Sequence, residues 1–150
     1  PSAEARRRAM RLLAEVDVPV SVLVAPVIPS LNDDVIERVL DSEANAGSSD
    51  AAYLFLRLPH EVKIIFKEWL HTHLPDRAAR VMNLVREASG GQDYDNRFGF
   101  RQTGRGPYAD LLGKRFHAAC RRFGFDSERR GAGLDCSLFD PPGQQQLGLF

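Results

Sequence analysis

Two short apolar segments constrain the fold of this chain more than any other feature. Residues 18–29 (VPVSVLVAPVIP) and residues 51–58 (AAYLFLRL) are rich in β-branched and aromatic side chains, and each run ends at or beside a proline. Such segments are typical of strands buried on both faces of a parallel sheet. Between them, residues 33–46 have the apolar spacing of an amphipathic helix, with Asn32 as its expected N-cap and Gly47 as its stop. Strand, helix and strand with short links predict a parallel crossover unit, and therefore an α/β fold.

Chain length limits how much of such a fold is present. A closed (β/α) barrel needs about 250 residues, whereas this chain has 150. We expect residues 1–60 to hold an amphipathic helix and the strand–helix–strand unit, residues 61–125 to form a helical region, and the polar residues 126–150 to form a flexible tail. Within the helical region, helices are predicted over residues 62–74, 76–88 and 108–123. The apolar side chains expected to face inward in the first of these are Ile65, Phe66, Trp69 and Leu70.

Charge is unevenly distributed, although the chain as a whole has a formal net charge of zero. Residues 31–95 contain twelve acidic and seven basic side chains, whereas residues 97–130 contain nine basic and three acidic ones. The basic segment is the electrostatic candidate for a phosphate-rich partner such as DNA, and we expect weak, salt-dependent binding. The side chains expected to contact phosphate are Arg97, Arg101, Arg105, Lys114 and Arg122.

Cysteine content limits the metal chemistry of this chain. It has two cysteines, Cys120 and Cys136, which are too few for a four-cysteine zinc site or for a cluster that needs three thiolates. His71 and His73 lie two residues apart on a predicted helix, so they point in different directions and cannot chelate one metal. No phosphate-binding glycine loop, His-Glu-x-x-His pair or nucleophile elbow is present. We therefore assign no catalytic residue and no metal ligand within this chain.

Ligands of parallel α/β folds bind where the strands end, at their carboxyl edge. This rule directs attention to residues 26–34 and 57–61. Arg57 has a planar guanidinium suited to a carboxylate or a phosphate, and a salt bridge to a neighbouring helix is an equally good interpretation. No apolar run approaches the ~20 residues of a membrane-spanning helix, and the first residues have no signal-peptide core. We expect a cytoplasmic protein.

Four motifs resemble, in order and spacing, the branch of radical S-adenosylmethionine (SAM) enzymes related to spore photoproduct lyase. They are PVSVLVAPVIPSLND at residues 19–33, LRLPHEV at 56–62, YDNRFG at 94–99 and GPYADLLGKRF at 106–116. The resemblance implies that the chain is the C-terminal part of a partial (β/α) radical SAM barrel, followed by a helical, basic C-terminal region. The family's Gly-x-Ile-x-Gly-x-x-Glu element, which lies against the adenine of SAM, is matched by Pro26, Ile28, Ser30 and Asp33. The residues implied to contact SAM or substrate are Ile28, Asn32, Asp33 and Arg57.

The last five residues, QLGLF, resemble the peptide with which bacterial DNA polymerases and repair proteins bind the sliding clamp. The clamp-binding residues that this resemblance implies are Gln146, Leu147, Leu149 and Phe150. A chance match, or a local hydrophobic contact, is the alternative.

The family's Cys-x3-Cys-x2-Cys motif, which holds the [4Fe-4S] cluster, is absent from this chain. The resemblance therefore implies an intact parent that binds SAM and the cluster, acts as a lyase-like enzyme in DNA repair or DNA metabolism, and supplies the missing N-terminal part of the barrel. This chain alone is expected to be inactive. The alternative is a non-catalytic module that binds nucleic acid and a sliding clamp.

Overall fold

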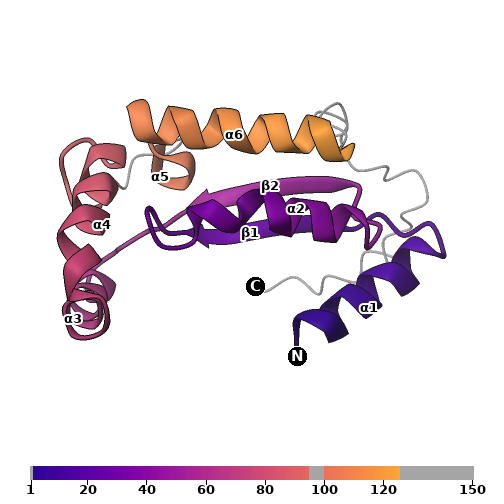
Figure 1. The fold of residues 1–150 in the computed structure, drawn as a ribbon, viewed down its shortest axis with the longest axis horizontal. Coiled ribbons are helices and arrows are strands. Elements are labelled where there is room, and N and C mark those ends of the chain that lie inside the picture. Colours follow the sequence, from indigo (N-terminus) through magenta and orange to yellow (C-terminus); the bar gives the residue numbers. More distant parts are fainter. Residues whose placement is uncertain (1, 95–99, 126–150) are drawn as a thin grey trace, which may run out of the picture.

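The computed structural model describes residues 2–94 and 100–125. Their fold is α/β, mostly helical, with a two-stranded parallel sheet (Figure 1). The elements, in chain order, are α1 (Ala3–Ala14), β1 (Ser21–Val27), a 3-10 turn η1 (Asp33–Val35), α2 (Ile36–Ala44), β2 (Asp50–Phe55), α3 (Val62–His73), α4 (Pro75–Ala88), α5 (Phe100–Thr103) and α6 (Pro107–Phe123). None of the helices in these ranges is long and apolar enough to cross a membrane.

The strand–helix–strand unit forms as its sequence pattern predicts. Strands β1 and β2 run parallel, with Ser21 opposite Asp50 and Val24 opposite Tyr53, and the register shifts between Val24 and Val27. Helix α2 makes the crossover between the two strands. Parallel strands need such a crossover because the chain must return to the starting end of the sheet before the second strand begins, and a tight turn cannot span that distance.

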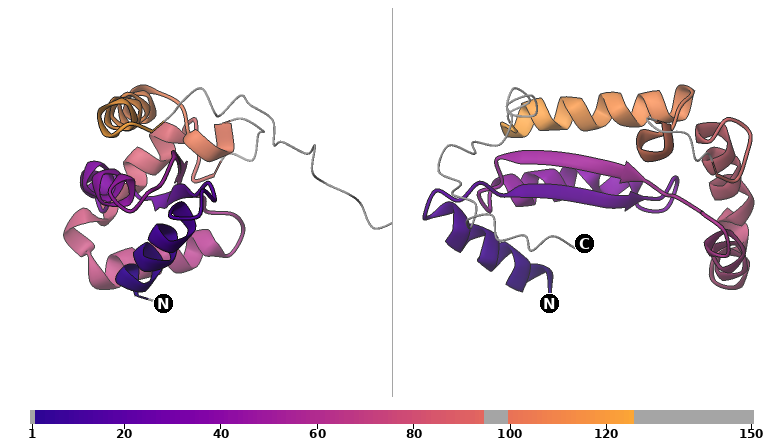
Figure 2. Two further views of the ribbon diagram at one scale, coloured as in Figure 1. Left: turned by 90° about the vertical axis from the view of Figure 1, so that its right-hand side faces the viewer. Right: turned by 180° about the vertical axis from the view of Figure 1, so that it is seen from behind.

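One face of the sheet is covered by α2 and α6, which lie on the same side of the strands (Figure 2). Alternate residues of the strands point to this side, and Val27, Ala51 and Phe55 are almost fully buried there. Helix α6 packs Phe116 against the ring of Tyr53, with ring centroids 4.7 Å apart. The first hydrophobic core therefore joins the strand unit to the last described helix.

The other face of the sheet is open. Leu23 is 56% exposed, and Ala25 and Ala52 on the same face are exposed as well. The prediction that both strands are buried on both faces is therefore wrong within the described residues. Seen from behind, the strands lie in front of α2 (Figure 2), while α5 packs beside β2.

A second hydrophobic core lies between α3 and α4, beyond the carboxyl ends of the strands. It contains Leu58 and Leu70, together with the buried α4 residues Val81 and Val85. The expectation that four apolar side chains of α3 face inward holds in part. Phe66 and Leu70 pack on this core, but Ile65 is 64% exposed and Trp69 is 42% exposed, so their inward assignment is wrong.

Helix α1 lies apart from both cores. Ser2 caps it as the sequence allows, since the Ala5 amide donates to the Ser2 hydroxyl oxygen. None of its residues is buried, and Leu12 and Leu13 are about half exposed. A hydrogen bond joins it to α2, with Arg7 donating to the hydroxyl of Ser42 at 2.8 Å. Leu12 and Leu13 therefore present apolar surface that the other described residues leave about half open.

Candidate functional site

The loop after β1 is closed by the side chain of Asn32. Its Oδ1 accepts a hydrogen bond from the Ile28 amide at 2.7 Å, and its Nδ2 donates to the carbonyl of Pro26 at 3.0 Å. Asn32 occupies the N-cap position of η1, but its side chain makes no capping bond to the first turn, so that part of the prediction is wrong. Both polar atoms of the amide instead fix the path of the chain from the strand end to the helix.

Ser30, at the tip of this loop, has a φ of 60°. That value lies in the left-handed region, which glycine adopts without the steric cost that a Cβ atom brings. The turn is stabilised by the amides of Leu31 and Asn32, which both donate to the carbonyl of Ile28. A position that favours glycine is therefore occupied here by serine and held by surrounding hydrogen bonds.

Asp33 ties this loop to α6. The hydroxyl of Tyr108 donates to the carboxylate of Asp33, and Nη2 of Arg115 donates to its backbone carbonyl at 3.1 Å. Arg115 also donates two hydrogen bonds to the carboxylate of Glu37 on α2, from Nε at 3.0 Å and from Nη2 at 2.9 Å. Burial, followed by the bond to Asp33, raises the pKa of Tyr108 well above its usual value. At neutral pH the phenol therefore keeps its proton and donates it in the hydrogen bond to Asp33. This bond links the β1 loop to α6.

Arg57 follows β2, at the same end of the sheet as the β1 loop. Its side chain is exposed, its Nη2 donates to the hydroxyl of Tyr94 at 3.1 Å, and its guanidinium lies 5.9 Å from the centre of that ring. No carboxylate in the described ranges pairs with it, which removes the salt-bridge interpretation for these residues. The guanidinium keeps several donors for an anionic ligand.

The segment that carries Tyr94 is anchored by its neighbour Asp93. This carboxylate accepts from Lys67 on α3 and, at 2.7 Å, from Arg86 on α4. The hydrogen bond from Lys67 is the main reason that the pKa of Asp93 lies below its usual value. Asp93 therefore stays ionised and holds Tyr94 beside Arg57.

A cleft of about 470 Å³ opens between the β1 loop and α4. Ser30 and Asp33 line it on one side, and Arg77 and Arg80 line it on the other. Sequence reasoning missed the two arginines, although their i, i+3 spacing places them on one face of a helix. Asp34 and Asp76 also line the cleft, so its charges of both signs nearly balance.

Of the five predicted phosphate-contacting residues, the structure describes the side chains of three. Lys114 and Arg122 are exposed on α6, whereas Arg105 is half-buried, lies against Gly90 and donates its backbone amide to the carbonyl of Ala88. Arg97 lies outside the described residues, and of Arg101 only the backbone is described. The clamp-binding residues Gln146, Leu147, Leu149 and Phe150 also lie outside them.

The residues present do not fit an iron–sulfur cluster. Cys120 is buried on the apolar face of α6, Cys136 lies outside the described residues, and the chain has no third thiol. No group of three or more His, Cys, Asp or Glu side chains in the described part of the chain is arranged to hold a metal ion. The residues expected at the SAM site lie at the same end of the sheet, Ile28, Asn32 and Asp33 after β1 and Arg57 after β2. Comparison with known proteins finds no matching family model, no matching curated protein and no matching solved structure.

Proposed function

We propose that this chain is the C-terminal part of a radical SAM, lyase-like enzyme that acts in DNA repair or DNA metabolism in the cytoplasm. The observation that carries the proposal is the incomplete sheet. Two parallel strands are covered on one face only, and no described strand pairs with the outer edge of β1. Parallel sheets are normally buried on both faces, and two strands alone are marginally stable. Further strands of the same barrel, added beside β1, would complete it.

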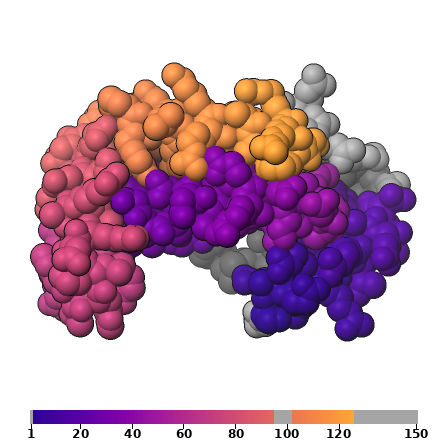
Figure 3. Space-filling view, in the orientation of Figure 1, coloured from indigo at the N-terminus to yellow at the C-terminus, as the bar shows by residue number. Residues whose placement is uncertain are grey.

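The surroundings of the β1 edge favour the same partner. A groove of about 640 Å³ runs between α1, β1 and α2, and its apolar lining includes Met10, Leu23 and Val39. The α1 residues that line this groove are Ala3, Arg6, Arg7 and Met10. Figure 3 shows the molecule hollowed between α1 and the α3–α4 pair. A preceding strand with its own apolar side chains would bury these surfaces together.

The carboxyl end of the sheet supports a SAM-binding role. Ser30 corresponds to the second glycine of the family's adenine-binding element, and its φ of 60° is a conformation that glycine favours. In the proposed parent, Ile28 and the backbone around Asn32 flank the adenine, and Asp33 holds the loop through Tyr108. Arg57 binds a carboxylate or phosphate of SAM or of the substrate. The [4Fe-4S] cluster belongs to the N-terminal part of the parent.

The test uses the protein encoded by the complete natural reading frame. We expect a Cys-x3-Cys-x2-Cys motif upstream, cluster absorbance after anaerobic reconstitution with iron and sulfide, and formation of 5′-deoxyadenosine from SAM. The 150-residue chain, treated identically, should give neither signal. In the parent, Arg57→Gln should weaken binding of SAM or substrate, whereas Arg8→Gln on the exposed face of α1 should not. A natural start codon with no such motif upstream would overturn the proposal.

A non-catalytic module that binds nucleic acid and a sliding clamp is the second candidate. The exposed cations Lys114 and Arg122 on α6 favour it, as does the clamp-like peptide at residues 146–150. A peptide of residues 141–150 should bind a bacterial clamp with micromolar affinity, on the order of −8 kcal/mol. Replacing Leu149 and Phe150 by alanine should cost more than about 2 kcal/mol. Equal affinities of the two peptides would remove the clamp from the proposal.

A further inference from the structure

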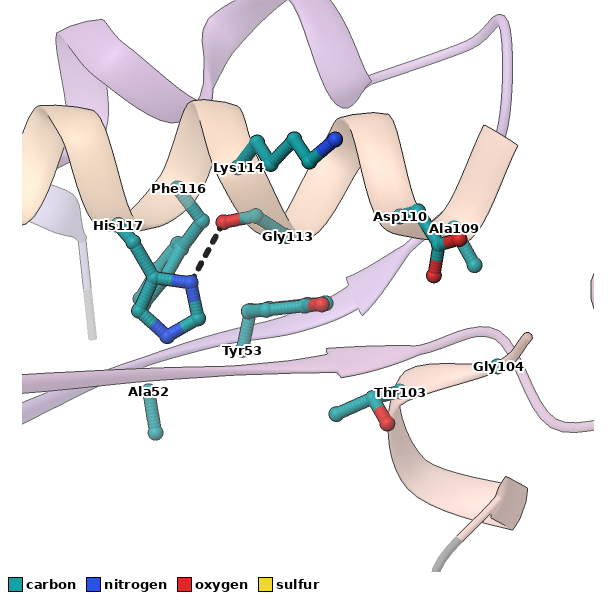
Figure 4. Close-up of a pocket in the computed structure, with 10 residues that line it drawn as sticks. All are labelled: Ala52, Tyr53, Thr103, Gly104, Ala109, Asp110, Gly113, Lys114, Phe116 and His117. Carbon is teal, nitrogen blue, oxygen red and sulfur yellow. Dashed lines mark hydrogen bonds between the residues drawn. The ribbon is translucent and has the colours of Figure 1, made fainter. Parts of the chain in front are cut away.

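A further cavity, of about 520 Å³, lies beneath α6 and beside β2, and it takes no part in the proposed SAM site (Figure 4). Part of its wall is apolar, formed by Ala52, Ala109 and Phe116. Figure 4 shows Tyr53 from β2 and His117 from α6 at the hollow, with Thr103 of α5 across from them. The cavity thus combines an apolar surface with polar groups from three different elements.

The polar groups of this cavity are available to a ligand. The hydroxyl of Tyr53 makes no hydrogen bond with the described residues. Burial and the nearby Asp110 raise its pKa, so it stays a donor at neutral pH. Nδ1 of His117 lies 2.7 Å from the carbonyl of Gly113. When that nitrogen donates its proton, Nε2 of the neutral ring is left as an acceptor. The absence of a side chain on Gly113 leaves room for the phenol, because a Cβ atom there would lie 3.3 Å from its oxygen.

Polar and charged residues lie along the same side of α6. Asp110, Lys114, His117 and Arg121 are spaced four, three and four residues apart and are all exposed, so they form one stripe along the cavity side of the helix. No ion pair joins Lys114 or Arg121 to any other residue in the described ranges. The helical rise separates these two cations by about 10 Å along the axis. Lys114 therefore lines the cavity, and Arg121 lies about two turns further along the same side of the helix.

We propose that this cavity binds one unpaired nucleobase of a single-stranded nucleic acid, with Lys114 and Arg121 binding the phosphates beside it. A flat heteroaromatic ring matches the apolar wall, and its edge carries both donors and acceptors. Base amino groups donate to Asp110 or to Nε2 of His117, while a ring nitrogen or carbonyl accepts from Tyr53. The inference rests on the nucleic-acid part of the proposed function, and it requires neither SAM nor a cluster.

The test is binding of a short, fluorescently labelled single-stranded DNA to the 150-residue chain, compared with the same strand carrying an abasic position at its centre. Loss of the base should weaken binding about tenfold. Tyr53→Phe and Asp110→Asn should remove most of this difference between the two strands while leaving binding of the abasic strand unchanged. Lys114→Gln and Arg121→Gln should weaken both strands equally and reduce the dependence on salt. Arg8→Gln, which removes the same charge from α1, is the matched control.

Each outcome decides one point. Equal binding of intact and abasic strands would overturn the base site while leaving salt-dependent nucleic-acid binding, and with it the proposed function, intact. A loss in Arg8→Gln as large as in Lys114→Gln would show that the cations of α6 have no special role. A free mononucleotide that competes at the same concentration as the oligonucleotide would overturn the assignment to a polynucleotide.

Discussion

The two faces of the sheet are built from similar side chains but differ in what covers them. On the face beneath α2 and α6, Val27 and Phe55 are nearly inaccessible to solvent, whereas Leu23 on the opposite face is 56% exposed. The helix that follows β1 packs on the first face, whereas α5 lies beside β2 and leaves Leu23 of the second face exposed. An apolar residue in a strand therefore indicates that its face of the sheet is stable only when buried. It does not indicate whether a neighbouring segment of the chain buries that face.

The largest effect should come from the covered face. Phe116 is 1% exposed and packs against the ring of Tyr53 at an interplanar angle of 50°, so Phe116→Ala removes a large buried side chain and leaves a cavity. We expect a loss of about 3–5 kcal/mol in the free energy of unfolding. Urea denaturation followed by circular dichroism measures it. A loss below about 1 kcal/mol would mean that α6 does not cover the sheet as described.

A smaller loss should follow removal of the bond between α6 and the β1 loop. Tyr108→Phe deletes the hydroxyl that donates to the Asp33 carboxylate, and a hydrogen bond to a charged group contributes about 1.5–3 kcal/mol. Because the folded protein raises the pKa of Tyr108, this contribution is complete below the ordinary tyrosine pKa of about 10 and falls as the pH rises above it. The gap between wild type and variant should therefore narrow in alkaline solution.

The ion pairs that Asp93 makes with α3 and α4 lie outside the sheet and provide the next prediction. Asp93→Asn weakens the pairing with Lys67 and Arg86, and for these partly exposed pairs we expect a loss of about 1 kcal/mol at neutral pH. Folding lowers the pKa of Asp93, so its stabilising effect is present above the unfolded value of about 3.9 and disappears as the pH falls through the folded value. Thermal unfolding at neutral and at strongly acidic pH checks this sign. A difference that persisted in strong acid would contradict it.

The open face should give the smallest effect in this chain. Leu23→Ala is expected to change the free energy of unfolding by less than about 0.5 kcal/mol, since over half of the side chain is already in contact with solvent. In the proposed parent the same residue is covered, and there the substitution should cost about 2 kcal/mol or more. If Leu23→Ala had an equally small effect on the unfolding free energy of both proteins, a preceding strand would not cover this face in the parent.

Local patterns in the sequence were sufficient to predict the main elements. The apolar period of residues 108–123 places Leu112, Phe116 and Cys120 on the buried side of α6, as observed. The partners of the polar side chains could not be read in this way. Tyr108 and Asp33 lie 75 residues apart, and Arg115 and Glu37 lie 78 residues apart, and no local spacing relates such pairs.

Two further differences have separate physical causes. An asparagine before a helix suits a cap and a closed loop equally well, because the same amide satisfies either set of backbone groups. Only the path of the chain decides that Asn32 closes the loop. Ile65 and Trp69 occupy positions that a helical wheel assigns to the apolar side of α3, but the second core contacts a narrower arc of that helix.

The Asn32 loop has a consequence for the speed and strength of binding. Two hydrogen bonds from a single amide join its start and its end within seven residues, so it forms by local contacts that need no distant segment. A loop already restricted to one shape has little conformational entropy left to lose when a ligand arrives. Any molecule that binds at this end of the sheet therefore meets a preorganised surface, and Asn32→Ala should slow its association even where the amide never touches it.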